Sequence, residues 1–225
     1  MIWLNSGASG GRPSTIFARP SVFMNVARST DFGKSWESVV QSWEEPNLGT
    51  SLFVKVDTFN SDIIWAGGSN ALFIPSLLKS EDSGDTWRGL VVLENVEANV
   101  NDLITKNEEH AKSMIGLSGS VPEANIIRRS EDNGETWNTV FEGAGIYTFT
   151  HSASNPDIVY ASGINPEGRL FFLASNDFGD TWQTLDYPES PSGIYVNDMV
   201  SIMEDGEEVI YLGTNKGVYS LTFEE

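Results

Sequence analysis

Four copies of one octapeptide decide how this chain is organised: Ser29–Trp36 (STDFGKSW), Ser80–Trp87 (SEDSGDTW), Ser130–Trp137 (SEDNGETW) and Ser175–Trp182 (SNDFGDTW). All four follow the pattern S-x-D-x-G-x-[ST]-W without exception, and they are called boxes below. The box aspartates are 51, 50 and 45 residues apart. Repeats with a period in this range are typical of solenoids, propellers and other arrays of one supersecondary unit.

Each box has the residues of a tight turn. The aspartate can accept hydrogen bonds from nearby backbone N–H groups, and glycine adopts a positive φ without steric cost. The tryptophan supplies a large apolar surface that fixes the hairpin against its neighbour. The residues expected to play these structural parts are Ser29, Asp31, Gly33, Trp36, Ser80, Asp82, Gly84, Trp87, Ser130, Asp132, Gly134, Trp137, Ser175, Asp177, Gly179 and Trp182.

The motif resembles the Asp-box, or BNR repeat, of sialidases and of the wider Asp-box β-propeller group. That group includes sortilin-type receptors, xyloglucan-degrading glycosidases and a photosystem assembly propeller. In such proteins the box is a hairpin between the third and fourth strands of a blade, on the rim and away from the central pocket. The resemblance therefore implies a propeller fold and leaves the activity open.

Short apolar runs between the boxes, bounded by Asn, Pro, Gly and Asp, predict further strands rather than helices. We therefore expect an all-β chain: a β-propeller of four-stranded antiparallel blades, with about five blades or as a fragment of a larger propeller. The expected single domain covers 1–225, with blades at about 1–44, 45–94, 95–142, 143–190 and 191–225. Residues 1–5 resemble 63–67, which predicts that the chain begins at the second strand of a blade. The first and last blades are then incomplete.

Composition excludes several classes of partner. The formal net charge is −19, and phosphate recognition depends on clustered Lys and Arg, so nucleic acid is not an expected partner. There is no cysteine, and no window approaches the roughly 20 apolar residues of a membrane span. We expect no membrane insertion and no cofactor. The acidity is explained by solubility, or by an acidic patch that binds cations or a basic partner.

A repeated Asn-Asp pair gives the sharpest candidate site. Asn101-Asp102 and Asn197-Asp198 both fall on expected inner strands, whose side chains face the central channel of a propeller. Two carboxylates facing one channel are what glycoside hydrolysis requires. Alternatively, these residues satisfy backbone groups at the channel mouth. Asp102 and Asp198 are thus the catalytic candidates, and Asn101, Asn197 and Trp43 are the binding candidates, Trp43 because an exposed indole can stack on a sugar or contact a protein.

The resemblance to sialidases also implies an arginine clamp and an Arg-Ile-Pro segment. The nearest segment here, Phe17-Ala18-Arg19-Pro20, lacks the isoleucine, and Arg28, Arg88 and Arg129 flank boxes on the rim. A clamp for a carboxylate is therefore not expected. The only histidines, His110 in an expected polar turn and His151, are not spaced as metal ligands, so no metal site is predicted.

Loops on a rigid scaffold commonly carry binding residues. The stretches 7–21 and 69–76 are expected to be long loops between second and third strands. Our interpretation is a non-catalytic propeller that binds or scaffolds a protein or glycan. The alternative is a fragment of a sialidase-like or xyloglucanase-like glycoside hydrolase. Open end blades predict self-association. The resemblance suggests an extracytoplasmic or secreted protein, although no signal peptide is recognised.

Overall fold

The computed structural model describes residues 3–4, 15–19, 26–40, 48–57, 60–106, 109–185 and 193–222. These residues form nineteen strands in five antiparallel sheets, together with the short 3-10 helix η1 (Pro122–Ala124). The all-β propeller architecture predicted from the boxes is confirmed. No helix in the described part of the chain is both long and apolar enough to cross a membrane.

The sheets are numbered as blades 1 to 5 in chain order, with their strands in sequence order from one edge to the other. Blade 1 contains β1 (Trp3–Leu4), β2 (Ile16–Arg19), β3 (Val26–Ser29) and β4 (Glu37–Val40). Blade 2 contains β5 (Thr50–Val56), β6 (Ile64–Ser69), β7 (Pro75–Ser80) and β8 (Arg88–Leu90). Blade 3 contains β9 (Ala98–Lys106), β10 (Glu109–Gly119), β11 (Ile126–Ser130) and β12 (Asn138–Glu142). Blade 4 contains β13 (Gly145–His151), β14 (Val159–Ile164), β15 (Leu170–Ser175) and β16 (Gln183–Leu185). Blade 5 contains three described strands, β17 (Val196–Glu204), β18 (Glu207–Thr214) and β19 (Gly217–Thr222).

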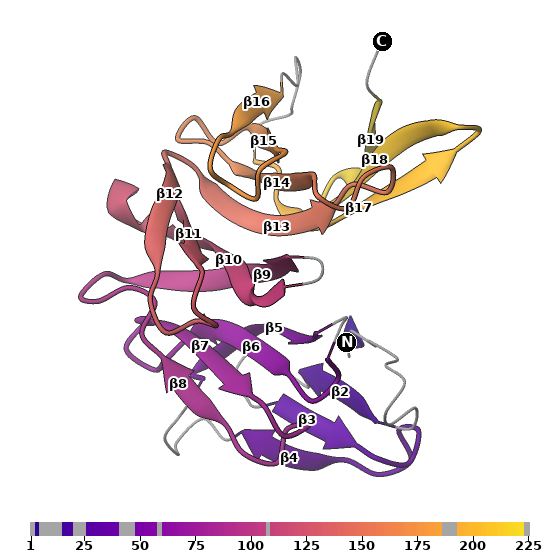
Figure 1. Ribbon diagram of the computed structural model, residues 1–225. Helices are drawn as coiled ribbons and strands as arrows, with labels where there is room; N and C mark the ends of the chain where they lie inside the picture. The colour runs from indigo at the N-terminus through magenta and orange to yellow at the C-terminus, as the bar shows by residue number, and fades with distance from the viewer. Residues whose placement is uncertain are drawn as a thin grey trace.

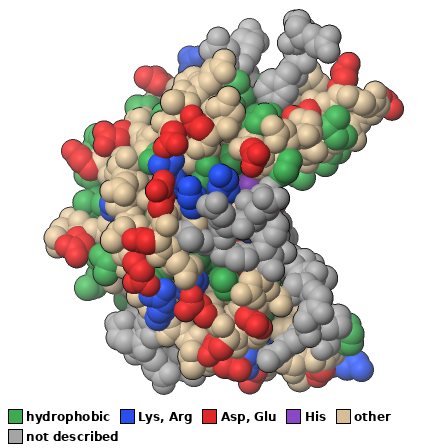
Figure 2. All heavy atoms as spheres, in the orientation of Figure 1, with side chains coloured by type: hydrophobic (Ala, Val, Ile, Leu, Met, Phe, Trp, Pro, Cys, Tyr) green, Lys and Arg blue, Asp and Glu red, His purple; other side chains and the backbone are tan. Residues whose placement is uncertain are grey.

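The five sheets follow one another in an open arc, with blades 1 and 5 at its two ends (Figure 1). The first strands of successive blades pack against one another in the order β5, β9, β13 and β17. The main packing between described strands of different sheets joins blades that follow one another in the chain. Acidic side chains are spread over the visible face rather than gathered in one patch (Figure 2), which is consistent with the solubility explanation of the net charge.

The prediction that the chain begins at the second strand of a blade was wrong. Trp3–Leu4 forms the first strand, β1, and pairs with β2, which holds the second-strand position. The stretch 7–21 is therefore not one long loop, because it contains β2. The predicted loop 69–76 is also shorter than expected, since β6 ends at Ser69 and β7 begins at Pro75.

The boxes form the turns between third and fourth strands, as expected, with a shared set of hydrogen bonds. In the third box, Asp132 Oδ1 accepts from the backbone N–H of Thr136 at 2.8 Å, and Oδ2 accepts from the Thr136 hydroxyl at 2.5 Å. Ser130 Oγ accepts from the N–H of Gly134 at 2.8 Å. The same bonds recur in the other three boxes. Each box is thus held together by local contacts.

The box turn requires two successive residues in the left-handed region. The residue before each glycine has a φ between 53° and 65°, and the glycine itself has a φ between 80° and 90°. Glycine reaches this region without strain, whereas the residues before it, Phe32, Ser83, Asn133 and Phe178, do so at a cost that is smallest for asparagine.

The hydrogen bonds of the boxes predict an acid-sensitive fold. Bonds from the backbone N–H of Ser35, and then from the Ser35 and Ser29 hydroxyls, lower the pKa of Asp31 from 3.8 to about 2. The pKa values of Asp82 and Asp132 are also lowered, chiefly by the hydroxyls of the box threonines. A lowered folded-state pKa gives stabilisation that is complete above the unfolded pKa and is lost as the pH falls toward the folded one. The urea midpoint should therefore fall between about pH 4 and pH 2, and a midpoint that stays constant across this window would contradict the assignment.

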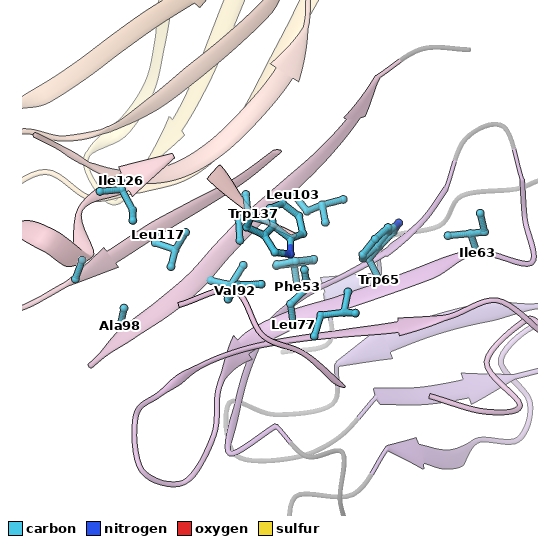
Figure 3. Packing of buried hydrophobic residues seen from close by; sticks show 14 residues of the cluster. Phe53, Ile63, Trp65, Leu77, Val92, Ala98, Leu103, Leu117, Ile126 and Trp137 are labelled. Atoms are coloured by element: carbon cyan, nitrogen blue, oxygen red, sulfur yellow. The ribbon is translucent and has the colours of Figure 1, made fainter. Parts of the chain in front are cut away.

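Neighbouring blades are joined by apolar packing. Phe53, Trp65 and Leu77 of blade 2 pack with Leu103 and Leu117 of blade 3 in one cluster, together with the tryptophan of the third box (Figure 3). Similar clusters join blades 1 and 2, 3 and 4, and 4 and 5. The face of a sheet that packs against the next blade in the chain is called its forward face below.

Cations on the rim add a polar link at three of these junctions. Arg28, Lys79 and Arg129, the rim cations, directly precede the boxes of blades 1, 2 and 3. Arg28 donates to Ser83 O at 3.0 Å and pairs with Asp85 at 2.5 Å. Arg129 donates to Phe178 O at 3.0 Å and pairs with Asp180 at 2.6 Å, and the fully buried Lys79 donates to the Asn133 side chain. Each rim cation therefore holds the box of the following blade.

Candidate functional site

A β-bulge lies at the same place in the first strand of blades 2 to 5. The pairing between first and second strands shifts between Ser51 and Phe53, Val100 and Asp102, Ile146 and Thr148, and Val196 and Asp198. The bulged residues are Leu52, Asn101, Tyr147 and Asn197. Bulges redirect side chains and often lie next to functional sites. The predicted residues Asn101 and Asn197 therefore mark a backbone irregularity that their sequence pattern did not reveal.

Asn101 connects two neighbouring bulges. Its Nδ2 donates to Ser118 Oγ at 2.8 Å within blade 3 and to the backbone oxygen of Ile146 at 2.7 Å in blade 4. Ile146 directly precedes the bulge of β13. Both amide hydrogens are used in these contacts, so the geometry gives Asn101 a role in joining blades.

Asp102 joins the first strands of three blades. Its side chain pairs with Lys55 of β5, Oδ1 to Nζ 2.5 Å, and its Oδ2 accepts from the N–H of Phe149 on β13 at 2.9 Å. Lys55 Nζ also donates to the backbone oxygen of Leu103 at 2.9 Å. Asp102 is 6% exposed, so this carboxylate is committed to a partly buried ion pair.

Asp198 has a different environment from its counterpart. Asn197 and Asp198 are exposed, and Asp198 Oδ1 accepts from the adjacent N–H of Met199 at 2.8 Å. The strand β13 lies between β9 and β17, so the two candidate acids stand on either side of blade 4. The structure does not place Asp102 and Asp198 together as a pair.

His151 lies on the same inner strand layer, next to this ion pair. Its ring nitrogens lie 3.0 Å from Thr105 O and 2.8 Å from Pro156 O. Burial, and to a smaller extent the charge of Lys55, lowers the pKa of His151. A neutral imidazole donates to only one of the two carbonyls at a time.

Other predicted residues contribute less. His110 lies in β10 rather than in a turn, and Trp43 falls outside the described residues. No group of three or more His, Asp or Glu side chains suited to a metal ion occurs within the described ranges.

A pocket that the sequence analysis missed lies on the forward face of blade 4. It has a volume of about 450 Å³ and is lined by Ile158, Tyr160, Ala174, Ser175, Asn176, Thr181, Trp182, Gln183 and Leu185. None of these lining residues carries a formal charge at neutral pH. Burial, followed by the nearby charge of Glu208, raises the pKa of Tyr160 to about 12, and the Tyr160 hydroxyl donates to Glu208 at 3.3 Å.

The pocket exists because two features of the earlier blades are missing here. Ala174 stands where Arg28, Lys79 and Arg129 stand in blades 1 to 3. The described part of blade 5 contributes no box hairpin to cover the outer half of blade 4. In the sequence, the sign of this pocket was Ala174, a small residue directly before the fourth box.

Comparisons with known proteins agree on the fold. No protein-family model and no curated protein matches the sequence. Among solved structures, the chain is similar to the GH74 enzyme of Niastella koreensis, with a TM-score of 0.73 and 16% identity over 97% of this chain and 35% of that one. It is also similar to the GH74 xyloglucanase of Xanthomonas campestris, with a TM-score of 0.71 and 15% identity over 93% and 35%. YCF48 from Cyanidioschyzon merolae matches with a TM-score of 0.62 and 15% identity over 96% and 66%.

The chain spans about a third of the length of the GH74 structures. At these identities the likeness concerns the fold alone. All three neighbours are β-propellers, so the comparisons agree with the predicted architecture. An activity for this chain has to be argued from its own residues.

Proposed function

We propose that this chain is a non-catalytic Asp-box propeller, a single domain over 1–225, that binds a neutral glycan in the pocket on blade 4. The observation that carries the proposal is the uncharged lining of this 450 Å³ pocket, where Tyr160, Leu185 and Ile158 are combined with Asn176 and Gln183. Ligand pockets are typically about 300–1,000 Å³, mostly apolar, with a few polar groups that fix orientation. A pyranose ring presents apolar C–H faces and hydroxyl groups, which match these two kinds of side chain.

The non-catalytic part of the proposal is supported by the use of Asp102. A glycosidase acid or nucleophile must reach the scissile bond, whereas Asp102 is engaged with Lys55 and the N–H of Phe149. One GH74 neighbour is named a xyloglucanase, which suggests xyloglucan oligosaccharides as the first ligands to try.

A substitution that fills the pocket tests the binding site. Ala174→Arg introduces the side chain that precedes the third box, and it should weaken oligosaccharide binding by at least about tenfold in calorimetric titration. Thr184→Arg is the matched control, because Thr184 is exposed and pairs with Leu173 on the other face of the same sheet. Equal binding by the wild type and Ala174→Arg would contradict this assignment.

Reducing-sugar release from xyloglucan tests the alternative that the chain is part of a glycoside hydrolase. We expect no turnover. Turnover that is lost in Asp198→Asn or Asp102→Asn would establish catalysis and overturn the non-catalytic proposal.

A peptide ligand is the second candidate. One similar structure, with a TM-score of 0.59, is described as YCF48 bound to a D1 peptide. Peptide binding that is blocked by Ala174→Arg, without oligosaccharide binding, would favour this candidate over the glycan.

A further inference from the structure

The first three junctions between blades share one geometry, in which the box of one blade covers the forward face of the blade before it. A Cβ added to Gly84 would lie 2.8 Å from the ring of Phe17, and one added to Gly179 would lie 2.6 Å from Met114 Sδ. A Cβ on Gly134 would lie 3.3 Å from the Trp65 ring. Box glycines therefore lie directly over a large side chain on the second strand of the preceding blade.

The face of blade 5 that corresponds by strand register to the forward faces of blades 1 to 3 has the same layout, and no further blade follows it among the described strands. By strand register, Val200, Tyr211 and Ser220 occupy the positions of Ile104, Met114 and Arg129 in blade 3. Ile104 and Met114 are buried by blade 4. On blade 5, Val200 is 49%, Ile202 37% and Val218 72% exposed. Val200, Ile202 and Val218 thus form an exposed apolar surface on this face, next to Glu204, which accepts from the Tyr211 hydroxyl at 2.9 Å.

Blade 1 carries the complementary half of such a junction. In the fourth box, Phe178 packs on blade 3 and is 4% exposed, whereas its counterpart in the first box, Phe32, is 68% exposed. Trp36 is 41% exposed, while Trp137 belongs to the cluster between blades 2 and 3. The residues of the first box that correspond to these packing residues are therefore exposed in the described structure.

The charges at these two ends do not oppose each other. The sixth box position is Asp85, Glu135 and Asp180 in boxes 2 to 4, and Arg28 and Arg129 pair with Asp85 and Asp180. In the first box this position is Lys34, and in blade 5 the position of the rim cation is Ser220. A junction between blade 5 and the first box therefore brings no two cations together.

We propose that two copies of this chain associate head to tail, with blade 1 of one copy packed on the forward face of blade 5 of the other. Gly33 of the first box then covers Tyr211, as Gly179 covers Met114, and Phe32 and Trp36 contact the surface around Val200. One such contact buries the exposed faces at both ends of the open arc, and it has the same geometry as the first three junctions between blades within one chain. Such a contact joins two different surfaces, so it continues into rings or chains of copies.

Sedimentation of the full chain over a concentration series tests the proposal. We expect masses above the 24.7 kDa of one chain, and stronger association at higher salt, because the −19 charge of each copy opposes association and is screened. Phe32→Asn blocks the first end with a residue that the third box uses at the same positive φ, and Val200→Asp blocks the other end. Each variant alone should weaken self-association by at least about tenfold.

The two variants should restore association when they are mixed, because each retains one intact end, and they should give 1:1 dimers. Phe73→Asn is the matched control, since Phe73 is also exposed with φ 61° but lies between β6 and β7. It should associate as the wild type does. A wild-type chain that stays monomeric at all concentrations, or single variants that do not pair when mixed, would overturn the proposal.

Discussion

Gly163→Ala is expected to destabilise the protein by about 3 kcal/mol, a large part of the stability of a typical domain. The new Cβ would lie 1.8 Å from the backbone oxygen of Gly145 and 2.9 Å from Ile146 Cα. These are main-chain atoms of β13 at its bulge, so they cannot move without breaking the pairing of β13 with β14. Urea unfolding of the variant measures the loss.

Gly213→Ala is the control for this prediction. Gly213 also lies on a second strand opposite a bulge, but the nearest atom to its added Cβ is Asp198 O at 3.7 Å. Its free energy of unfolding should change by less than about 1 kcal/mol. A similar loss in both variants would show that the close backbone approach at Gly163 is not the cause.

Asp102→Ala is expected to lower the free energy of unfolding by about 2–4 kcal/mol. The substitution leaves Lys55, which is about two-thirds buried, without its carboxylate and leaves the N–H of Phe149 without an acceptor. Removing one partner of such a pair costs more than the pair contributes, because the remaining charge stays desolvated.

Asp198→Ala is the control, because Asp198 is the equivalent aspartate of the second Asn-Asp pair. Asp198 follows the same bulge but is exposed, so Asp198→Ala should change the unfolding free energy by less than about 1 kcal/mol. Asp102→Asn should fall between the two, because the amide oxygen still accepts from Phe149 while the charge is lost. Equal effects at Asp102 and Asp198 would contradict the role given to Lys55.

The box hairpins could be predicted from the sequence because their structure is local. The aspartate, serine and glycine of each box bond to residues within four positions of one another, so the octapeptide contains nearly all the information that its turn requires. The strands between boxes were predicted from apolar runs with turns at their ends, which is enough for strand existence but not for strand position within a blade.

The first blade shows that limit. The run Met1–Leu4 resembles the run that includes Ile64 and Trp65, a second strand. In the structure Trp3–Leu4 forms β1, and the second-strand position belongs to Ile16–Arg19. First and second strands are both short and apolar, and only their hydrogen-bonding partners distinguish them.

The candidate site was predicted in part. The repeated Asn-Asp pairs lie on the first strands β9 and β17, but the partners of Asp102 lie 47 residues away in either direction, at Lys55 and Phe149. Long-range contacts of this kind leave no local pattern. The pocket on blade 4 was missed because it arises where Ala174 replaces the long cationic side chain of the earlier blades. This replacement is recognised only when the blades are aligned by strand register.

The rim cations have one further consequence, because each of them contacts the following blade in the chain. Arg28, Lys79 and Arg129 each hold the following box, so the first four blades form a directional linear array in which each of blades 1 to 3 stabilises its successor. In such arrays stability is approximately a sum of unit terms and nearest-neighbour couplings. The rim half of the fourth junction has neither a cation nor a described box, so we expect its coupling there to be weaker than at the first three junctions. Local opening at this end of the array should therefore begin at the rim of blades 4 and 5 and spread inward to the contacts of Glu208 with Tyr160 and Ser201.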